Sequence, residues 1–370
     1  MMRYSRHCLV ILLMLAISLG TLSTVQAARG TPGSLEFGIG AAYYPSGPYQ
    51  KEALAMAADL DPDWLYVPIS WAAYQANAST QPRFETLDAV FRVAEENQIS
   101  IVASIRGTPA WAQTPQGPDA AQTAQFVTVL TRRYPKVLQA VELFPRANTA
   151  AGWGSTANPQ AYFDLFRVVD AGLRESGSTV ALVAAGLEPL AAKPSAGDMD
   201  DLAFLKALYA AGARQLMPVI SMQYTHLSGD LLQFPNGPDA KVLRHYEDVR
   251  KVMVESNHRN GTIWITHISP PSGTIRESGS DKTEEERLVE WITQVYIQTR
   301  SQLYIGVTVG QSLNPEREGT AAGVSSLLQG AGMVHPLYSE LKEMIGLNKA
   351  GSVTIEPARP KEGNFSKKRP

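Results

Sequence analysis

The chain alternates eight times between a short run rich in β-branched and aromatic residues and a longer amphipathic stretch. Such alternation is typical of a parallel sheet, because each strand is connected to the next parallel strand by a helix. The predicted strands are residues 35–39, 64–69, 100–105, 137–144, 179–184, 216–222, 262–268 and 303–309. The predicted helices are residues 51–58, 84–97, 121–133, 159–175, 200–211, 240–256, 283–299 and 336–345.

Eight strand–helix pairs within about 310 residues match a (β/α)8 barrel, which typically needs about 250 residues plus insertions. The main rival is a doubly wound open sheet, which would have fewer strands and a phosphate-binding fingerprint. The segment Gly38-Ile39-Gly40 lacks the third glycine and the helix start of that fingerprint. We therefore predict the α/β class, with a single (β/α)8 TIM barrel over residues 28–348.

The N-terminus has the pattern of a secretory signal peptide. Arg3 and Arg6 precede an apolar run over residues 8–19, and the small-residue sequence Val-Gln-Ala ends at position 27. The apolar run is shorter than the ~20 residues that a membrane span needs. We predict that residues 1–27 are removed, which leaves a secreted protein (extracellular or periplasmic) without a membrane span.

Composition argues against several other classes of function. A formal net charge of −2 at pH 7 argues against nucleic acid as a partner. Cys8 is the only cysteine and lies in the predicted signal, so the mature chain would have no disulfide. The six histidines are scattered and no metal-binding or nucleotide-binding motif is present, so we predict no metal and no cofactor. Residues 349–370 are rich in Pro, Gly and Lys, which predicts a disordered basic tail.

Several strand ends carry recognisable motifs. Residues 140–148 read Ala-Val-Glu-Leu-Phe-Pro-Arg-Ala-Asn, residues 262–268 read Thr-Ile-Trp-Ile-Thr-His-Ile, and residues 108–112 read Thr-Pro-Ala-Trp-Ala. Together they resemble the clan A glycoside hydrolases, the retaining (β/α)8-barrel enzymes of xylosidase and cellulase type. That family reads roughly Glu-Ile-Trp-Asn-Glu-Pro-Asn at the first site and Trp-Ile-Thr-Glu-Phe-Gly at the second. The resemblance extends over essentially the whole mature chain.

The resemblance also implies that both catalytic carboxylates are missing. The acid/base glutamate of the family falls on Arg146 and the nucleophile glutamate on His267. Retaining hydrolysis needs two carboxyl groups about 5–5.5 Å apart, and an arginine stays protonated at any working pH. The asparagine before the acid/base is Pro145 here, which has no donor. We therefore predict a degenerate, catalytically inactive member with no catalytic residue.

Three other glutamates could in principle replace the missing pair. Glu142 lies four residues before Arg146, on the same strand face but about 13 Å deeper, which predicts a structural role in the packed interior. Glu188 follows the fifth predicted strand, and Glu277 lies in a long loop after the seventh. An active O-glycosyl hydrolase that uses Glu188 and Glu277 as displaced carboxylates therefore remains the alternative.

Aromatic residues near the strand ends suggest carbohydrate binding instead. A tryptophan face can stack on a sugar ring without any carboxylate, although such residues also pack barrel mouths. The candidate sugar-binding residues are Trp71, Trp111, Asn148, Trp153, Tyr224 and Trp264, with Tyr43, Tyr44 and His226 nearby.

The same mouth would be cationic. Arg146 and His267 stand where the family has two acids, which suits an anionic sugar such as a uronate. The sequence thus predicts a secreted, inactive, glycoside-hydrolase-like protein that binds an oligo- or polysaccharide in the barrel mouth. A structural partner of another secreted enzyme is the third hypothesis.

Overall fold

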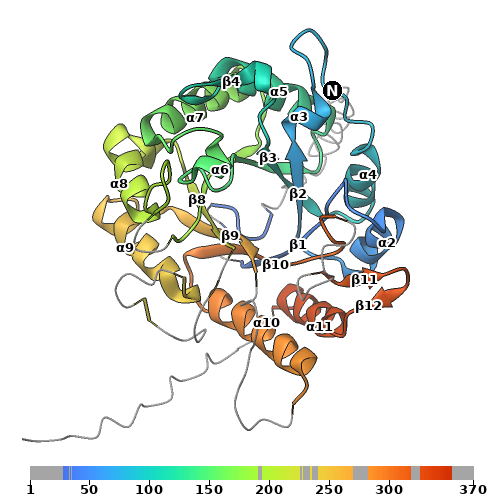
Figure 1. The fold of residues 1–370 in the computed structure, drawn as a ribbon. Helices are drawn as coiled ribbons and strands as arrows, with labels where there is room; N and C mark the ends of the chain where they lie inside the picture. The colour runs from blue at the N-terminus through green and yellow to red at the C-terminus, as the bar shows by residue number, and fades with distance from the viewer. Residues whose placement is uncertain are drawn as a thin grey trace, which may run out of the picture.

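The computed structural model describes residues 28–32, 34, 36–190, 194–225, 227, 234–235, 241–269, 282–317 and 326–351. Within these residues, eight parallel strands close into a barrel in which each strand pairs with its neighbours in chain order. Figure 1 views the barrel with the helices arranged in a ring around the strands. The predicted (β/α)8 barrel is therefore confirmed.

All eight predicted strands are present. They are β1 (Gly38–Ala42), β2 (Trp64–Ser70), β3 (Ser100–Arg106), β6 (Leu138–Leu143), β7 (Ala181–Leu187), β8 (Val219–Tyr224), β9 (Thr262–Ile268) and β10 (Ile305–Ser312). Two short hairpins lie outside the barrel, β4 (Gln113–Thr114) with β5 (Gly117–Pro118), and β11 (Leu328–Gly330) with β12 (Met333–Val334).

A helix follows each barrel strand and covers the outside. These are α2 (Gln50–Leu60), α4 (Asp88–Glu96), α5 (Ala120–Arg133), α7 (Pro159–Glu175), α8 (Asp201–Ala211), α9 (Tyr246–Glu255), α10 (Glu284–Arg300) and α11 (Leu337–Lys349). Local sequence fixes several of their starts. Asn158 caps α7 ahead of a proline in its first turn, and Thr283 forms a capping box with Glu286 at the start of α10.

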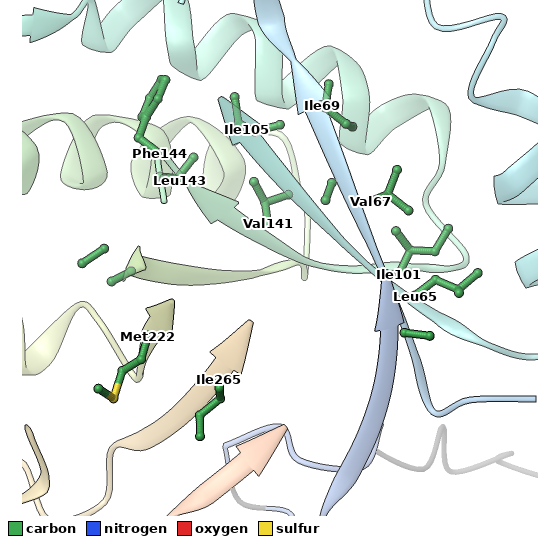
Figure 2. Packing of buried hydrophobic residues seen from close by; sticks show 14 of the residues in the cluster. Leu65, Val67, Ile69, Ile101, Ile105, Val141, Leu143, Phe144, Met222 and Ile265 are labelled. Atoms are coloured by element: carbon green, nitrogen blue, oxygen red, sulfur yellow. The ribbon is translucent and has the colours of Figure 1, made fainter. Parts of the chain in front are cut away.

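Strand alternation divides the core into two layers. Outward positions such as Leu65, Val67, Ile101 and Val141 pack with the helices in the larger cluster, and Figure 2 shows these side chains on β2, β3 and β6. Inward positions form a second cluster inside the barrel, made by Ala42, Trp64, Tyr66, Val102, Ala140, Val183, Val219, Trp264, Val307 and Val309. The barrel interior is therefore a packed core, and any site must lie above it.

The differences from the predicted boundaries occur mainly at strand ends. β10 continues to Ser312, three residues beyond the prediction, because its backbone still pairs with β1 at Gln311 and Ser312, where the sequence is no longer apolar. Helix α11 reaches Lys349, where the tail was predicted to begin. The predicted signal (1–27) and residues 352–370 of the tail lie outside the described residues. No helix in the part of the chain that the structure describes is long and apolar enough to cross a membrane.

Candidate functional site

A pocket of about 810 Å³ opens at the C-terminal ends of the barrel strands. Active sites of this barrel type lie at this end, because the βα loops converge there. Its polar lining side chains come from strands β2, β3, β8 and β9 and from the loops that follow β1, β6, β8 and β10: Tyr44, Ser46, Tyr66, Ser70, Arg106, Arg146, Gln223, Thr225, His267, Glu316 and Arg317. Arg146 and His267, which the sequence resemblance matches to the catalytic glutamates of the clan A enzymes, thus line one pocket.

The backbone that carries Arg146 is strained and held in place. Arg146 has a φ of 62°, in the left-handed region that non-glycine residues rarely adopt. Its N–H donates to the carbonyl of Gly186 at 2.8 Å, and its own carbonyl accepts from the backbone and hydroxyl of Thr149 at 2.8 and 2.9 Å. Gly152 lies so close that a Cβ there would meet the Arg146 carbonyl oxygen at 2.3 Å. Such strain persists only where the surroundings fix it, and it is common at functional sites.

The side chain of Arg146 faces Glu188 across the junction between β6 and β7. Their closest nitrogen and oxygen atoms are 3.7 Å apart, and the Arg146 side chain is 36% exposed. Glu188 is buried and accepts a hydrogen bond from the hydroxyl of Thr225. Glu188, the candidate for a displaced catalytic acid, is therefore an ion-pair partner of Arg146.

A second arginine–glutamate pair lies on another part of the rim. Arg106, at the end of β3, contacts Glu316 at 2.6 Å, and its guanidinium lies 6.0 Å from the ring centre of Tyr44. Burial, with the Glu316 carboxylate next in importance, raises the pKa of Tyr44 to about 12 against the opposing charge of Arg106. Tyr44 therefore presents a protonated hydroxyl to the pocket at neutral pH.

The floor of the pocket is a hydrogen-bonded network around Glu142. Its Oε2 accepts from the hydroxyls of Tyr66 at 2.9 Å and Ser104 at 2.7 Å, and its Oε1 accepts from Thr266 at 2.7 Å. Gln223 donates to the Tyr66 hydroxyl at 3.1 Å and so closes the network from above. Burial, followed by the charge of Glu142, raises the pKa of Tyr66 well above its usual value. Glu142 is fully buried, and its predicted structural role is confirmed.

His267 occupies the sixth position of β9, opposite Gln223 of β8. Its ring is half-buried, and Nε2 lies 2.9 Å from the hydroxyl of Ser269. His267 thus presents a hydrogen-bonded imidazole beside the polar floor of the pocket.

Trp264 does not lie in the mouth, which corrects the sequence-based expectation. It is the third residue of β9, fully buried, and its indole packs edge-on against Trp64 with ring centres 4.9 Å apart. Its indole N–H donates to the carbonyl of Gly30 at 3.0 Å. The error arose because the motif placed Trp264 near a strand end, whereas β9 continues for four more residues.

The other three tryptophan candidates pack around the mouth without lining the pocket. Trp71, the first residue of α3 (Trp71–Tyr74), is fully buried against Trp111 and Phe126. Trp153 ends α6 (Ala150–Trp153), is buried, and donates to the carbonyl of Gln116 at 2.8 Å. Trp111 is partly exposed and is held by Trp71. These three tryptophans therefore pack against other side chains around the mouth, which was the alternative to sugar stacking.

Asn148 and Tyr224 also serve the scaffold. The Asn148 amide bridges the loops after β6 and β7, donating to the carbonyl of Glu188 at 2.9 Å and accepting from its N–H at 2.9 Å. The hydroxyl of Tyr224 donates to the carbonyl of Leu243 at 2.7 Å. His226 and Glu277 lie outside the described residues.

Sequence reasoning missed Arg106, Glu316, Arg317, Tyr66 and Gln223 as pocket residues. For Tyr66 and Gln223 a signal existed, since they share strand faces with inward apolar residues such as Trp64 and Val219. Arg106 closes a strand at the inward position two residues after Ser104. Nothing in the sequence pattern brings residues 316–317 to the mouth. Among the described residues, no group of three or more His, Cys, Asp or Glu side chains could hold a metal ion.

The closed parallel barrel with its pocket at the strand C-termini has the fold of the clan A glycoside hydrolases. The chain is similar to a family 39 glycoside hydrolase from the gut symbiont Bacteroides cellulosilyticus WH2, with a TM-score of 0.65 and 13% identity over 84% of this chain and 64% of the other. It is similar to a family 39 enzyme from Xanthomonas axonopodis pv. citri, with a TM-score of 0.61 and 14% identity over 87% of this chain and 68% of the other.

A third similar structure is xylanase 10B from Thermotoga maritima, with a TM-score of 0.55 and 13% identity over 88% of this chain and 99% of that enzyme. No protein-family model and no curated protein matches the sequence. At these identities the likeness establishes the fold alone.

Proposed function

We propose that the protein is a secreted, non-hydrolytic member of the glycoside-hydrolase fold that binds carbohydrate in the pocket at the barrel mouth. The observation that carries the proposal is the identity of two pocket residues. Arg146 and His267 stand at the two positions where the family has its catalytic glutamates, and both line one pocket of about 810 Å³. A pocket of this size falls in the range of small-ligand sites.

The pocket has polar and aromatic groups that can bind a sugar, but its described residues lack the pair of opposed carboxyl groups that hydrolysis needs. Ser70, Gln223 and Thr225 offer hydroxyl and amide groups, and Tyr44 and Tyr66 offer aromatic surface with a polar tip. Retaining hydrolysis needs a carboxyl on each side of the glycosidic bond. Of the described carboxylates at this end, Glu188 and Glu316 each face an arginine, and Glu142 is buried below the floor.

The test is a binding and turnover experiment on the purified protein. We expect at least one glycan of a broad array to bind, with affinity measured by calorimetry, and no hydrolysis of aryl β-glycosides or of the bound oligosaccharide above background. Turnover that disappears in Glu188→Gln or in Glu277→Gln would instead support the displaced-carboxylate alternative. Failure to bind any glycan would favour the structural-partner hypothesis.

A double variant tests the two positions directly. Arg146→Glu combined with His267→Glu restores a carboxyl at each family position. If the two positions correspond to the catalytic pair, this variant gains measurable hydrolysis, whereas either single variant remains inactive because one carboxyl alone cannot complete the double displacement. Arg174→Glu, on the outer face of α7, is the matched control.

A further inference from the structure

We propose that the mouth pocket binds an acidic sugar, whose carboxylate is held by the guanidinium of Arg146. The inference rests on the proposed function and names the substrate class of the same site. It depends on how Arg146 and Glu188 face one another inside the pocket, at a distance too long for a hydrogen bond.

The guanidinium of Arg146 has N–H donors that make no hydrogen bond to a described residue. Within the described part of the chain, its one polar contact is the ion pair with Glu188 at 3.7 Å, which is longer than a hydrogen bond. A guanidinium carries five N–H donors in a planar fork. These donors face a solvent-filled pocket from a side chain that is 36% exposed.

Several other arginines of the same chain form hydrogen-bonded ion pairs with their carboxylates. Arg174 donates to both oxygens of Asp170 at 2.7 and 3.0 Å, and Arg133 donates to both oxygens of Asp88 at 3.0 and 2.7 Å. Arg106 reaches Glu316 at 2.6 Å on the rim of this pocket. Arg167 and Asp164 on α7 are also 3.7 Å apart, but both side chains are exposed on the helix surface, whereas Arg146 and its unpaired donors line a pocket.

Both members of the open pair are fixed by neighbours that keep them apart. The Arg146 backbone is anchored to Gly186 and Thr149, and the Glu188 backbone is anchored to Asn148. The Glu188 carboxylate is engaged by the Thr225 hydroxyl. A ligand carboxylate can therefore take the open edge of the guanidinium without first breaking a closed hydrogen-bonded pair.

The chemistry of the guanidinium favours an acid over a neutral sugar. Among the described lining residues, Arg106 is closed onto Glu316 at 2.6 Å, whereas Arg146 faces Glu188 only at 3.7 Å. A carboxylate matches the guanidinium fork in a bidentate arrangement, and a charge-assisted pair is about twice as strong as a neutral hydrogen bond. Glu142 lies below the floor, so the acid group belongs at the Arg146 side and the neutral hydroxyls belong over Tyr66 and Gln223.

The first experiment compares acidic sugars with neutral counterparts of the same shape. Oligosaccharides of galacturonate, glucuronate and mannuronate, and their carboxyl-reduced forms, are titrated into the purified protein by calorimetry. We expect at least one uronate to bind about tenfold or more tightly than its reduced form, because a charged hydrogen bond contributes about 1.5–3 kcal/mol and 1.4 kcal/mol is tenfold. The difference should shrink in high salt.

The outcomes separate this inference from the proposed function. Equal or tighter binding of the neutral forms overturns the acidic-sugar inference and leaves carbohydrate binding intact. Binding of none of them, nor of any glycan on the array, overturns both. A sulfated oligosaccharide is included, and tighter binding of the sulfate than of every uronate would overturn the carboxylate assignment.

Two variants with opposite effects test the role of Arg146. Arg146→Gln should weaken uronate binding about tenfold or more and leave the neutral form unchanged. Glu188→Gln is nearly isosteric and removes the competing charge, so it should strengthen uronate binding. A purely structural pair would instead weaken acidic and neutral binding alike in both variants, and that result would overturn the proposal. Arg174→Gln on α7 is the matched control, and Arg146→Lys serves if Arg146→Gln does not fold.

Discussion

The charged side chain of Glu142 is fully hydrogen-bonded in the barrel interior, whereas at the barrel mouth Arg146 has only one long ionic contact with a described residue. Beneath the pocket, Glu142 is fully buried, accepts hydrogen bonds of 2.7–2.9 Å from three hydroxyls, and forms no ion pair with any residue that the structure describes. At the rim, Arg146 has one ionic contact at 3.7 Å and a partly exposed side chain. Buried charge must be satisfied inside the protein, because an unpaired charge away from water is costly. Donors at the mouth can instead be satisfied by water or by a ligand.

The backbone near the mouth is also strained. Phe144, Arg146 and Ala185, near the ends of β6 and β7, have φ values of 47°, 62° and 76°. Strain of this kind is offset by the surrounding structure and is common at functional sites. We therefore expect side chains of the interior to govern stability and those of the rim to govern ligand binding, and the following variants test that division.

The largest expected effect is in the interior. Trp264→Ala removes a fully buried indole that packs on Trp64 and donates to Gly30. We expect a loss of about 3–5 kcal/mol in the free energy of unfolding, measured by urea denaturation. Trp111→Ala, at the partly exposed rim, should cost clearly less. Equal costs at the two positions would contradict the division between interior and mouth.

A second test concerns a buried pair of opposite charges. His245 Nε2 lies 2.7 Å from Asp201, and both side chains are buried where α8 meets the start of α9. Burial favours the neutral ring, but hydrogen bonds and charge from Asp201, with Asp248 adding to them, outweigh it and raise the pKa of His245 to about 9. A raised pKa in the folded state means that the stabilisation is complete below about pH 6.5 and is lost as the pH rises through about 9.

We therefore expect the unfolding free energy of the wild type to fall between pH 6.5 and pH 9, by on the order of 3 kcal/mol. Denaturation at pH 6, 7.5 and 9 measures it. Asp201→Asn should flatten this dependence, whereas Asp248→Asn, whose carboxylate lies 3.5 Å from Nδ1, should flatten it less. A wild type with constant stability over this range would show that the pair is not charged.

The fold could be predicted from the sequence far better than the site could. The strand and helix pattern records burial against helices, which is a local and repeated signal, so all eight strands were found and α7 matched at both ends. Position within the mouth is set by how far each strand runs and by loops distant in sequence. Glu316 reaches Arg106, 210 residues away, and no local pattern predicts that contact.

The tryptophans illustrate the same limit. An indole is the side chain expected to stack on a sugar, but it is also the side chain that contributes most to a core. The sequence placed Trp71 and Trp153 near strand ends correctly and could not reveal that neighbouring side chains bury them. The inference from Arg146 and His267 does not depend on side-chain packing, because it rests on which residue types stand at two motif positions, and it stays a prediction.

An intermediate effect is expected at the pocket floor. Glu142→Gln keeps the shape but replaces one acceptor oxygen by a donor that faces hydroxyl donors. We expect a loss of about 1–3 kcal/mol in the free energy of unfolding, since an unsatisfied buried polar group costs about that much. Ser104→Ala, which removes one of the three hydroxyls, should cost less because two donors to Glu142 remain. A stabilised Glu142→Gln variant would show that the buried charge is not well satisfied.

The smallest expected effect has the opposite sign and lies at the rim. Arg146→Gly places at a φ of 62° the one residue that adopts this region without strain, and the backbone hydrogen bonds to Gly186 and Thr149 do not need the side chain. Relief of strain is offset in part by the greater freedom of glycine in the unfolded chain, so the net gain should be at most about 1 kcal/mol. Arg146→Gln retains the strain and serves as the matched control, so the difference in melting temperature between the two variants isolates the backbone term. If Arg146→Gly is less stable than Arg146→Gln, the left-handed conformation is not a strained one, and the assignment of the rim to function rather than stability loses its backbone argument.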